Sequence, residues 1–332
     1  MSNAWRLSVA VLFAVAACTS ADRNPLTTDL RNAITEMLTH IESPAAKQSA
    51  DMIERSMERQ RSDNPAVAEV LLGQYLNTDS YASTNPRYSQ AIEAYEKSLR
   101  RRPTGDALIG LGRVYYNVTM DYARSRSERN ATLDQSDVKR ITSGLRAAVT
   151  AFERGLSAKT TLGTVDTSRA AAFKGEVSTV LSSVESGNIR ALRLRPTAAV
   201  RHLKEGSAFR RLDPERARES YRQALRISPD YPEAYFNLAG TYYDEKRYSE
   251  AVKEWVQGIS LMETEIVQAG IPVDLVRDDL SRQAFDAGSA FFLIGQAAKA
   301  KEYWTKALQV KPDYSQAKRN LELLREKRPD LW

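Results

Sequence analysis

One spacing constrains the fold of this chain more than any other feature. A small residue, an aromatic residue and an aliphatic residue recur with a step of 34, at Ala217 and Ala251, Tyr221 and Trp255, and Leu225 and Ile259. A fixed step kept at several positions indicates an internal repeat, in which each unit buries its apolar face against the next. The sequence therefore predicts a stack of similar units.

Each unit has the pattern of two short helices. In residues 232–264, four residues at spacings of 3, 1 and 3 share one helix face, and a polar turn over residues 244–247 precedes a second set with the same logic. The first set is Tyr235, Leu238, Ala239 and Tyr242, and the second is Tyr248, Ala251, Val252, Trp255, Gly258 and Ile259. Small residues allow two helices to approach closely while aromatic rings fill the flanking space, so the unit reads as a helical hairpin.

These residues resemble the tetratricopeptide repeat, a helix-turn-helix unit of 34 residues that ends on a proline such as Pro229. The resemblance implies an all-α, right-handed solenoid of about five or six hairpins. A later copy containing Ala284 and Trp304 is offset by 49, so residues 266–280 hold an insertion, in which we expect Pro272 to begin an elongated first helix. The charged residues 315–332 predict a capping helix at the C-terminus.

The N-terminal half repeats the pattern less regularly. Residues 66–76 and 88–103 predict one hairpin, and residues 108–117 predict a first helix whose partner comes only at residues 145–156. The intervening 117–142 segment is polar and rich in Arg and Ser, so we expect a mobile surface loop, with a partner-binding loop as the alternative. Upstream, two further helices are expected, one starting at Thr27 or Thr28 and one opened by Ser43-Pro44.

The N-terminus resembles a bacterial lipoprotein signal. Arg6 precedes an apolar run that is too short to span a bilayer, and Val15-Ala16-Ala17-Cys18 resembles a lipobox. The resemblance implies that Cys18 becomes the lipid-bearing first residue; an ordinary signal peptide cut at Ala17, or a free cysteine, is the alternative. Thr19 after the cysteine favours the outer membrane, facing the periplasm, because Asp at this position resembles an inner-membrane retention signal.

These features predict five segments. They are a signal peptide over 1–17, a tether over 18–26, an N-terminal block of degenerate repeats over 27–159, an irregular connection over 160–196 with one helix around 170–184, and a C-terminal repeat block with its cap over 197–332.

The composition leaves little for catalysis. The chain has one Cys and two isolated His, and no nucleophile elbow, phosphate loop or zinc spacing, so we expect no enzyme activity, no cofactor and no metal. The formal net charge is +6 at pH 7, and the basic clusters 100–102 and 210–211 match no nucleic-acid motif, so we expect them at solvated helix ends and expect no nucleic-acid partner.

A second aromatic line runs about 100° around the first helices from the packing face. By resemblance to tetratricopeptide repeats, this line is concave and accepts an extended or helical partner segment; the alternative is that the rings pack on neighbouring helices. The carboxylate clamp of some family members is not expected, because only one clamp residue, Asn237, matches clearly. The predicted groove residues are Ile109, Arg113, Tyr116, Phe236, Asn237, Tyr243, Asp244, Phe285 and Phe292.

Three functions fit these observations differently. The first is a lipid-anchored scaffold or adaptor of the bacterial envelope that binds an envelope protein or peptide segment. The second is a lipoprotein that binds a small ligand in a pocket between the helical blocks. The third, a lipid-anchored hydrolase, needs a nucleophile and a base that the sequence does not supply. The sequence predicts neither the identity of the partner nor an oligomeric state.

Overall fold

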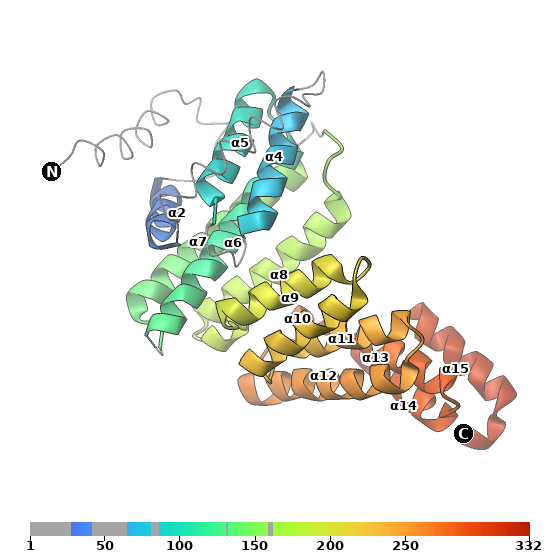
Figure 1. Ribbon diagram of the computed structural model, residues 1–332. Helices are drawn as coiled ribbons and strands as arrows, with labels where there is room; N and C mark the ends of the chain where they lie inside the picture. Colours follow the sequence, from blue (N-terminus) through green and yellow to red (C-terminus); the bar gives the residue numbers. More distant parts are fainter. Residues whose placement is uncertain (1–27, 42–64, 81–85, 131, 159–161) are drawn as a thin grey trace. The chain divides into compact units, whose positions relative to one another are not determined.

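The computed structural model describes residues 28–41, 65–80, 86–130, 132–158 and 162–332, and every regular element in these ranges is a helix (Figure 1). The predicted all-α fold is thereby confirmed. The signal peptide, Cys18, the tether and the helix expected after Ser43-Pro44 lie outside the described residues. The chain forms two compact units, and the division between them falls within α6, α7 and α8, whereas the sequence suggests a single break over 160–196.

Unit 1 contains the N-terminal helices. They are α2 (Thr28–Ile41), α4 (Pro65–Ser80), α5 (Tyr88–Arg101), the first part of α6 (Gly105–Arg129), the last part of α7 (Gln135–Ser157) and the first part of α8 (Thr167–Glu185). The pair α4 and α5 forms the predicted first hairpin. Tyr95 of α5 is buried and lies against Gly110 of α6, where an added Cβ would come within 2.2 Å of the ring. This contact realises the predicted close approach between a small residue and an aromatic ring.

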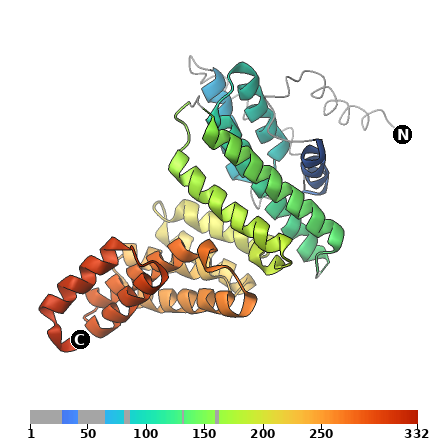
Figure 2. The ribbon, with the colours of Figure 1, turned by 180° about the vertical axis from the view of Figure 1, so that it is seen from behind.

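Unit 2 contains the regular repeats. Its elements after α8 are η3 (Ile189–Leu192), α9 (Thr197–Phe209), α10 (Pro214–Ile227), α11 (Pro232–Asp244), α12 (Tyr248–Ala269), η4 (Val273–Leu275), α13 (Arg277–Leu293), α14 (Ala297–Val310), α15 (Ser315–Lys327) and η5 (Pro329–Leu331). Successive helices form antiparallel pairs that can be followed in Figure 1 and, from behind, in Figure 2. Contacts of α10 with α11, α12 with α13, and α14 with α15 join one hairpin to the next, and α15 occupies the position of the predicted cap.

Helix ends in unit 2 follow local chemistry. Asp213 accepts a hydrogen bond from the amide of Arg216 at 3.0 Å, and Pro214 begins α10, a pairing that satisfies a free N–H and fixes φ at the helix start. The turns between α11 and α12 and between α13 and α14 each contain a left-handed residue, Lys246 (φ 62°) and Gly295 (φ 79°). These two residues are 49 positions apart and therefore occupy the same place in two repeats.

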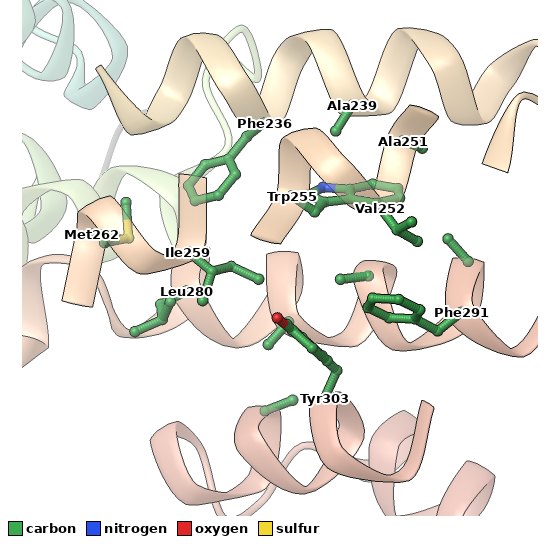
Figure 3. Packing of buried hydrophobic residues seen from close by; sticks show 14 of the residues in the cluster. Phe236, Ala239, Ala251, Val252, Trp255, Ile259, Met262, Leu280, Phe291 and Tyr303 are labelled. Atoms are coloured by element: carbon green, nitrogen blue, oxygen red, sulfur yellow. The ribbon is translucent and has the colours of Figure 1, made fainter. Parts of the chain in front are cut away.

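The main core cluster of unit 2 runs from Ala217 of α10 to Leu324 of α15. Trp255 of α12 is 2% exposed and Trp304 of α14 is 3% exposed, as predicted for the packing face. The indole Nε1 of Trp255 donates to the Oε1 of Gln283 at 2.8 Å, which joins α12 to α13. Figure 3 shows the rings of Trp255 and Phe291 among aliphatic side chains from neighbouring helices. The aromatic content of the repeat therefore serves mainly to fill the space between helices.

Two sequence-based expectations about insertions are wrong. The 117–142 segment is no loop, because α6 extends to Arg129 and α7 begins at Gln135. Tyr122 is fully buried in this extension, and its hydroxyl donates to the buried carboxylate of Asp137 at 2.8 Å. The two helices therefore contact each other through polar side chains, which an apolar pattern does not reveal. Likewise, the insertion around Pro272 lengthens the second helix α12 as far as Ala269, and the following first helix starts only at Arg277.

Candidate functional site

Two of the predicted groove residues are core residues. Ile109 is 1% exposed and Phe236 is 6% exposed, so neither can contact a partner in the folded protein. Phe236 turns from α11 toward α12, as Figure 3 shows, and an added Cβ at Gly258 would lie 2.6 Å from its ring. The prediction that these residues line a groove is wrong, because close helix packing at glycine leaves room that their side chains fill.

The predicted line on α13 also packs against neighbouring helices. The hydroxyl of Ser289 accepts from the indole Nε1 of Trp304 at 3.3 Å, and the ring of Phe292 lies 5.8 Å from that of Trp304. Phe285 is half-buried, with its ring 5.4 Å from that of Tyr314, just before α15. Phe292 is 46% exposed but sits on the α14 side of its helix. These contacts agree with the alternative that the rings pack on neighbouring helices.

The three predicted residues on α6 belong to unit 1, and the other predicted groove residues belong to unit 2. Tyr116 is half-buried, with its ring 5.1 Å from that of Phe173 on α8. Arg113 is half-buried and lowers the pKa of Tyr95, although burial raises that pKa by more than the arginine lowers it. Arg113 and Tyr116 therefore make their described contacts within unit 1, and the candidate site consists of residues of unit 2.

The polar face of the first helices lies one position beyond the predicted aromatic line. Asn237 follows Phe236 on α11, and Asp286 follows Phe285 on α13. The two residues are 49 positions apart and so are equivalent in consecutive repeats. With them we group the polar residues that surround them on α9, α11, α13 and the start of α15, and name the set the first-helix surface: Arg210, Asn237, Tyr243, Asp244, Asp286 and Tyr314.

Arg210 marks one end of this surface. Its guanidinium lies over Gly240, where an added Cβ would come within 2.6 Å of Nη2, and it forms an ion pair with Asp244 at 2.9 Å. The pair connects the residue after α9 to the last residue of α11. Because Gly240 has no side chain, the planar guanidinium can rest on the helix surface itself.

Asp286 is the electrostatic centre of the first-helix surface. Its side chain is half-buried, and burial raises its pKa to about 6, against smaller lowering effects of Arg282 and Arg210. Both of these arginines are engaged elsewhere, Arg282 with Asp279 and Arg210 with Asp244. Among the described residues, Asp286 itself forms neither a hydrogen bond nor an ion pair within the usual distances. A desolvated carboxylate without a partner is costly to a fold.

Two phenols lie close enough to sense the charge of Asp286. The pKa of Tyr243 is raised first by burial and then by Tyr248, Asp286 and Asp244, and the pKa of Tyr314 is raised by burial and by Asp286. Each ring is held by packing, Tyr243 at 5.6 Å from Trp255 and Tyr314 against Phe285. Neither phenol hydroxyl forms a hydrogen bond to the described part of the chain. The arrangement offers polar groups on rigid aromatic supports.

The sequence reasoning missed Asp286, Tyr314 and Arg210 as members of the surface. The sequence does contain a signal for Asp286, because this residue lies 49 positions after Asn237 and is therefore its equivalent in the next repeat. The aromatic residues lie on the side of each first helix that packs against neighbouring helices, so they do not mark the exposed polar side. No comparable sequence signal marks Tyr314 or Arg210, which reach the surface from turns at the ends of helices.

Other candidate chemistry is not assembled in the described residues. There, no three His, Cys, Asp or Glu side chains gather in a way that could hold a metal ion. His202 lies 3.6 Å from Glu205, one turn further along the same helix. The basic clusters contribute to ion pairs, Arg101 with Glu69 at 2.9 Å and Arg210 with Asp244. Of the helices described, none is both long and apolar enough to cross a membrane.

Comparison with protein families identifies the repeat. A family described as TPR repeat matches residues 214–245, which hold α10 and α11, and a family described as Tetratricopeptide repeat matches residues 81–128, which hold α5 and most of α6. The chain therefore contains tetratricopeptide repeats in both halves, and its fold is the predicted stack of repeat hairpins. No curated protein matches the chain.

Solved structures of repeat proteins resemble the chain at low sequence identity. MamA is 17% identical over 60% of this chain and 86% of its own, with a TM-score of 0.33. The TPR2AB domain of yeast Sti1, solved as a complex with pHSP90, is 14% identical over 79% of this chain and 97% of its own, with a TM-score of 0.31. A thermophilic TPR protein of Thermus thermophilus is 14% identical over 77% of this chain and 98% of its own, with a TM-score of 0.28.

Proposed function

We propose that this tetratricopeptide-repeat protein is a non-enzymatic scaffold or adaptor, anchored by a lipid in the bacterial envelope, that holds a segment of a protein partner on its first-helix surface. The observation that carries the proposal is the set of uncommitted polar groups on that surface. Asn237, Tyr243, Asp286 and Tyr314 come from consecutive repeats, and their side-chain polar atoms form no hydrogen bond to the described residues. Polar groups that the fold does not use are available to fix the direction and register of a bound segment.

Rigid display is the proposed mechanism. The aromatic rings of Tyr243 and Tyr314 are held against Trp255 and Phe285, so their hydroxyls keep fixed positions without a ligand. A surface that is already ordered loses little conformational entropy on binding. Residues that project from consecutive repeats can read a partner over several of its residues, as extended repeat surfaces do.

A crosslinked pull-down tests the binding surface. The native chain is compared with an Asn237→Ala/Tyr243→Phe double variant, which removes two uncommitted polar groups but keeps the ring that packs on Trp255. Gln257→Ala, an exposed polar position on the second helix α12, is the matched control. We expect one envelope protein to be recovered with the native chain and with the control but reduced about tenfold or more with the double variant. Equal recovery in all three would place the binding site elsewhere.

The anchor is proposed from the sequence. The residues Val15-Ala16-Ala17-Cys18 resemble a lipobox, and Thr19 favours the outer membrane, facing the periplasm. A lipid would confine the repeats near the membrane and raise the effective concentration of a membrane-bound partner. Labelling with an alkynyl fatty acid in a bacterial host should mark the native chain and leave Cys18→Ser unmarked, and density-gradient fractions should place the label with outer-membrane proteins. A label on both chains would contradict attachment through Cys18.

A further inference from the structure

Within the described residues, the carboxylate of Asp286 forms no hydrogen bond or ion pair that holds the fold together. The two arginines whose charges act on it are each paired with another carboxylate, Arg282 with Asp279 and Arg210 with Asp244 at 2.9 Å. A half-buried carboxylate normally gains an ion pair or hydrogen bonds in return for its lost hydration. Within the described residues Asp286 gains neither, so the group is both desolvated and uncommitted.

The surroundings of Asp286 favour a cation. The ring of Tyr314 lies 5.4 Å from that of Phe285, the residue before Asp286, and the ring of Tyr243 lies 5.6 Å from that of Trp255, whose indole N–H donates to Gln283 on the helix of Asp286. The charge of Asp286 also contributes to raising the pKa of both phenols. Aromatic faces attract Lys ammonium and Arg guanidinium groups, and a carboxylate in a partly dry site attracts them more strongly than one in water. The hydroxyls of the two phenols form no hydrogen bond within the described residues.

We infer that the half-buried carboxylate of Asp286 receives one basic side chain, a lysine or an arginine, from the partner segment. This inference rests on the proposed function and adds the chemistry of the partner to it. The polarity is the reverse of a clamp that binds carboxylates, because the uncommitted charge on the surface is negative while the cation of Arg210 is neutralised by Asp244. The occupant is therefore a basic position in a peptide segment, seated beside Asn237 at the equivalent point of the preceding repeat.

Protonation supplies an independent signature. Burial raises the pKa of Asp286 to about 6, and the charged or titratable groups that face it are Arg282 on its own helix, Arg210 after α9, Tyr243 on α11 and Tyr314 before α15. Of these groups only Asp286 changes its charge between pH 5 and pH 7, because arginines stay protonated and raised phenol pKa values lie far above this range. Binding of a basic side chain should therefore weaken as the pH falls through about 6.

The experiment is a selection from a random peptide library displayed on phage, against the full chain in detergent. The probes are the selected peptide itself and a copy in which norleucine replaces its basic residue. Asp286→Asn is compared with Glu322→Gln, which removes the same charge from an exposed position on α15. Thermal unfolding of each variant checks that the fold is intact.

We expect the selected peptides to share one Lys or Arg. Asp286→Asn and the norleucine copy should each weaken binding about tenfold or more, the two losses should not add, and Glu322→Gln should change affinity less than twofold. Peptides without a shared basic residue, or equal binding to native chain and Asp286→Asn, would overturn this inference and leave the proposed function standing. Failure to select any peptide would count against the first-helix surface as a binding surface, and therefore against both the proposed function and this inference.

Discussion

The indole of Trp304 on α14 lies so close to Gly288 on α13 that a Cβ at Gly288 would come within 2.6 Å of the indole Cδ1. The indole Nε1 is also held, since it donates to the carbonyl of Phe285 at 3.2 Å. A ring fixed from two sides cannot move away from an added methyl group. The absence of a side chain at Gly288 is therefore a condition for the spacing between the two helices.

Gly288→Ala should destabilise the protein by about 1 to 3 kcal/mol, because overpacking at Trp304 outweighs the better helix propensity of alanine. Gly175 on α8 gives a control within the same chain, since an added Cβ there meets nothing within 4 Å. Gly175→Ala should therefore stabilise by roughly 0.5 to 1 kcal/mol. Urea unfolding followed by circular dichroism measures both. A neutral result at Gly288 would mean that the indole can shift.

Trp255→Ala should destabilise the protein by about 3 to 5 kcal/mol, as expected when a large buried aromatic is removed from a packed core. The ring contacts Tyr243, and the indole N–H donates to Gln283, so the change also leaves the amide of Gln283 without this partner. Trp332, which is 47% exposed, supplies the comparison, and Trp332→Ala should cost less than about 1 kcal/mol. A small loss at Trp255 would contradict the assigned packing face.

Lys246→Gly should stabilise the protein by about 1 kcal/mol. Lys246 adopts a φ of 62°, a left-handed conformation that costs a residue with a side chain about this much, and the equivalent turn of the next repeat already has Gly295 there. The reverse change, Gly295→Lys, should destabilise by a similar amount. Differential scanning calorimetry of the two variants tests this symmetry. Shifts of the same sign in both variants would show that the turns are not equivalent.

Asp106→Asn should destabilise unit 1 by about 1 to 3 kcal/mol at pH 7. The buried carboxylate accepts hydrogen bonds at 2.7 Å from the amides of Leu162 and Thr164 and at 3.0 Å from the amide of Val165. In asparagine an NH2 group replaces one carboxylate oxygen, so this group would face a backbone N–H that has lost its acceptor.

The pH dependence of this change has a definite sign. Burial acts to raise the pKa of Asp106, but the hydrogen bonds from Thr164 and Leu162 together lower it below its ordinary value. Its contribution to stability is thus complete above about pH 4 and is lost as the pH falls through the lowered pKa. The free energy difference between the native chain and Asp106→Asn should narrow in acid. Glu153→Gln, which removes an exposed partner of Lys174, should cost under about 0.5 kcal/mol.

Asp286→Asn should have the opposite effect and raise stability by roughly 1 to 3 kcal/mol at pH 7.5. Burial raises the pKa of Asp286 to about 6 from an ordinary value near 3.8, so the folded native chain loses stability as the pH rises from about 4 to above 6. The asparagine variant has no such loss. Thermal unfolding of both proteins between pH 4 and pH 8 should give midpoints that diverge over this window. A lower midpoint for the variant at pH 7.5 would mean that the carboxylate supports the fold.

The sequence predicts the parts of this fold that apolar residues build, and it does not predict the parts that buried polar residues build. The step from Tyr221 to Trp255 located the core, because buried residues must recur with the period of the repeat. The extension of α6 and α7 was missed, because Tyr122 and Asp137 are buried as a hydrogen-bonded polar pair, which leaves no apolar period. The first-helix surface was displaced by one residue, since Phe236 and Asn237 are adjacent and only packing decides which one faces outward.

The pairing of Tyr122 and Arg126 with Asp137 carries a consequence for how such a chain can change length. Both α6 side chains donate to the same carboxylate oxygen of α7 at 2.8 Å, and that oxygen is buried. Shortening α6 alone by one turn would remove both of these side-chain donors from the buried carboxylate, and shortening α7 alone would remove the shared acceptor from the phenol and the guanidinium. A change of length in one arm of this hairpin should therefore cost more stability than the same change made in both arms together.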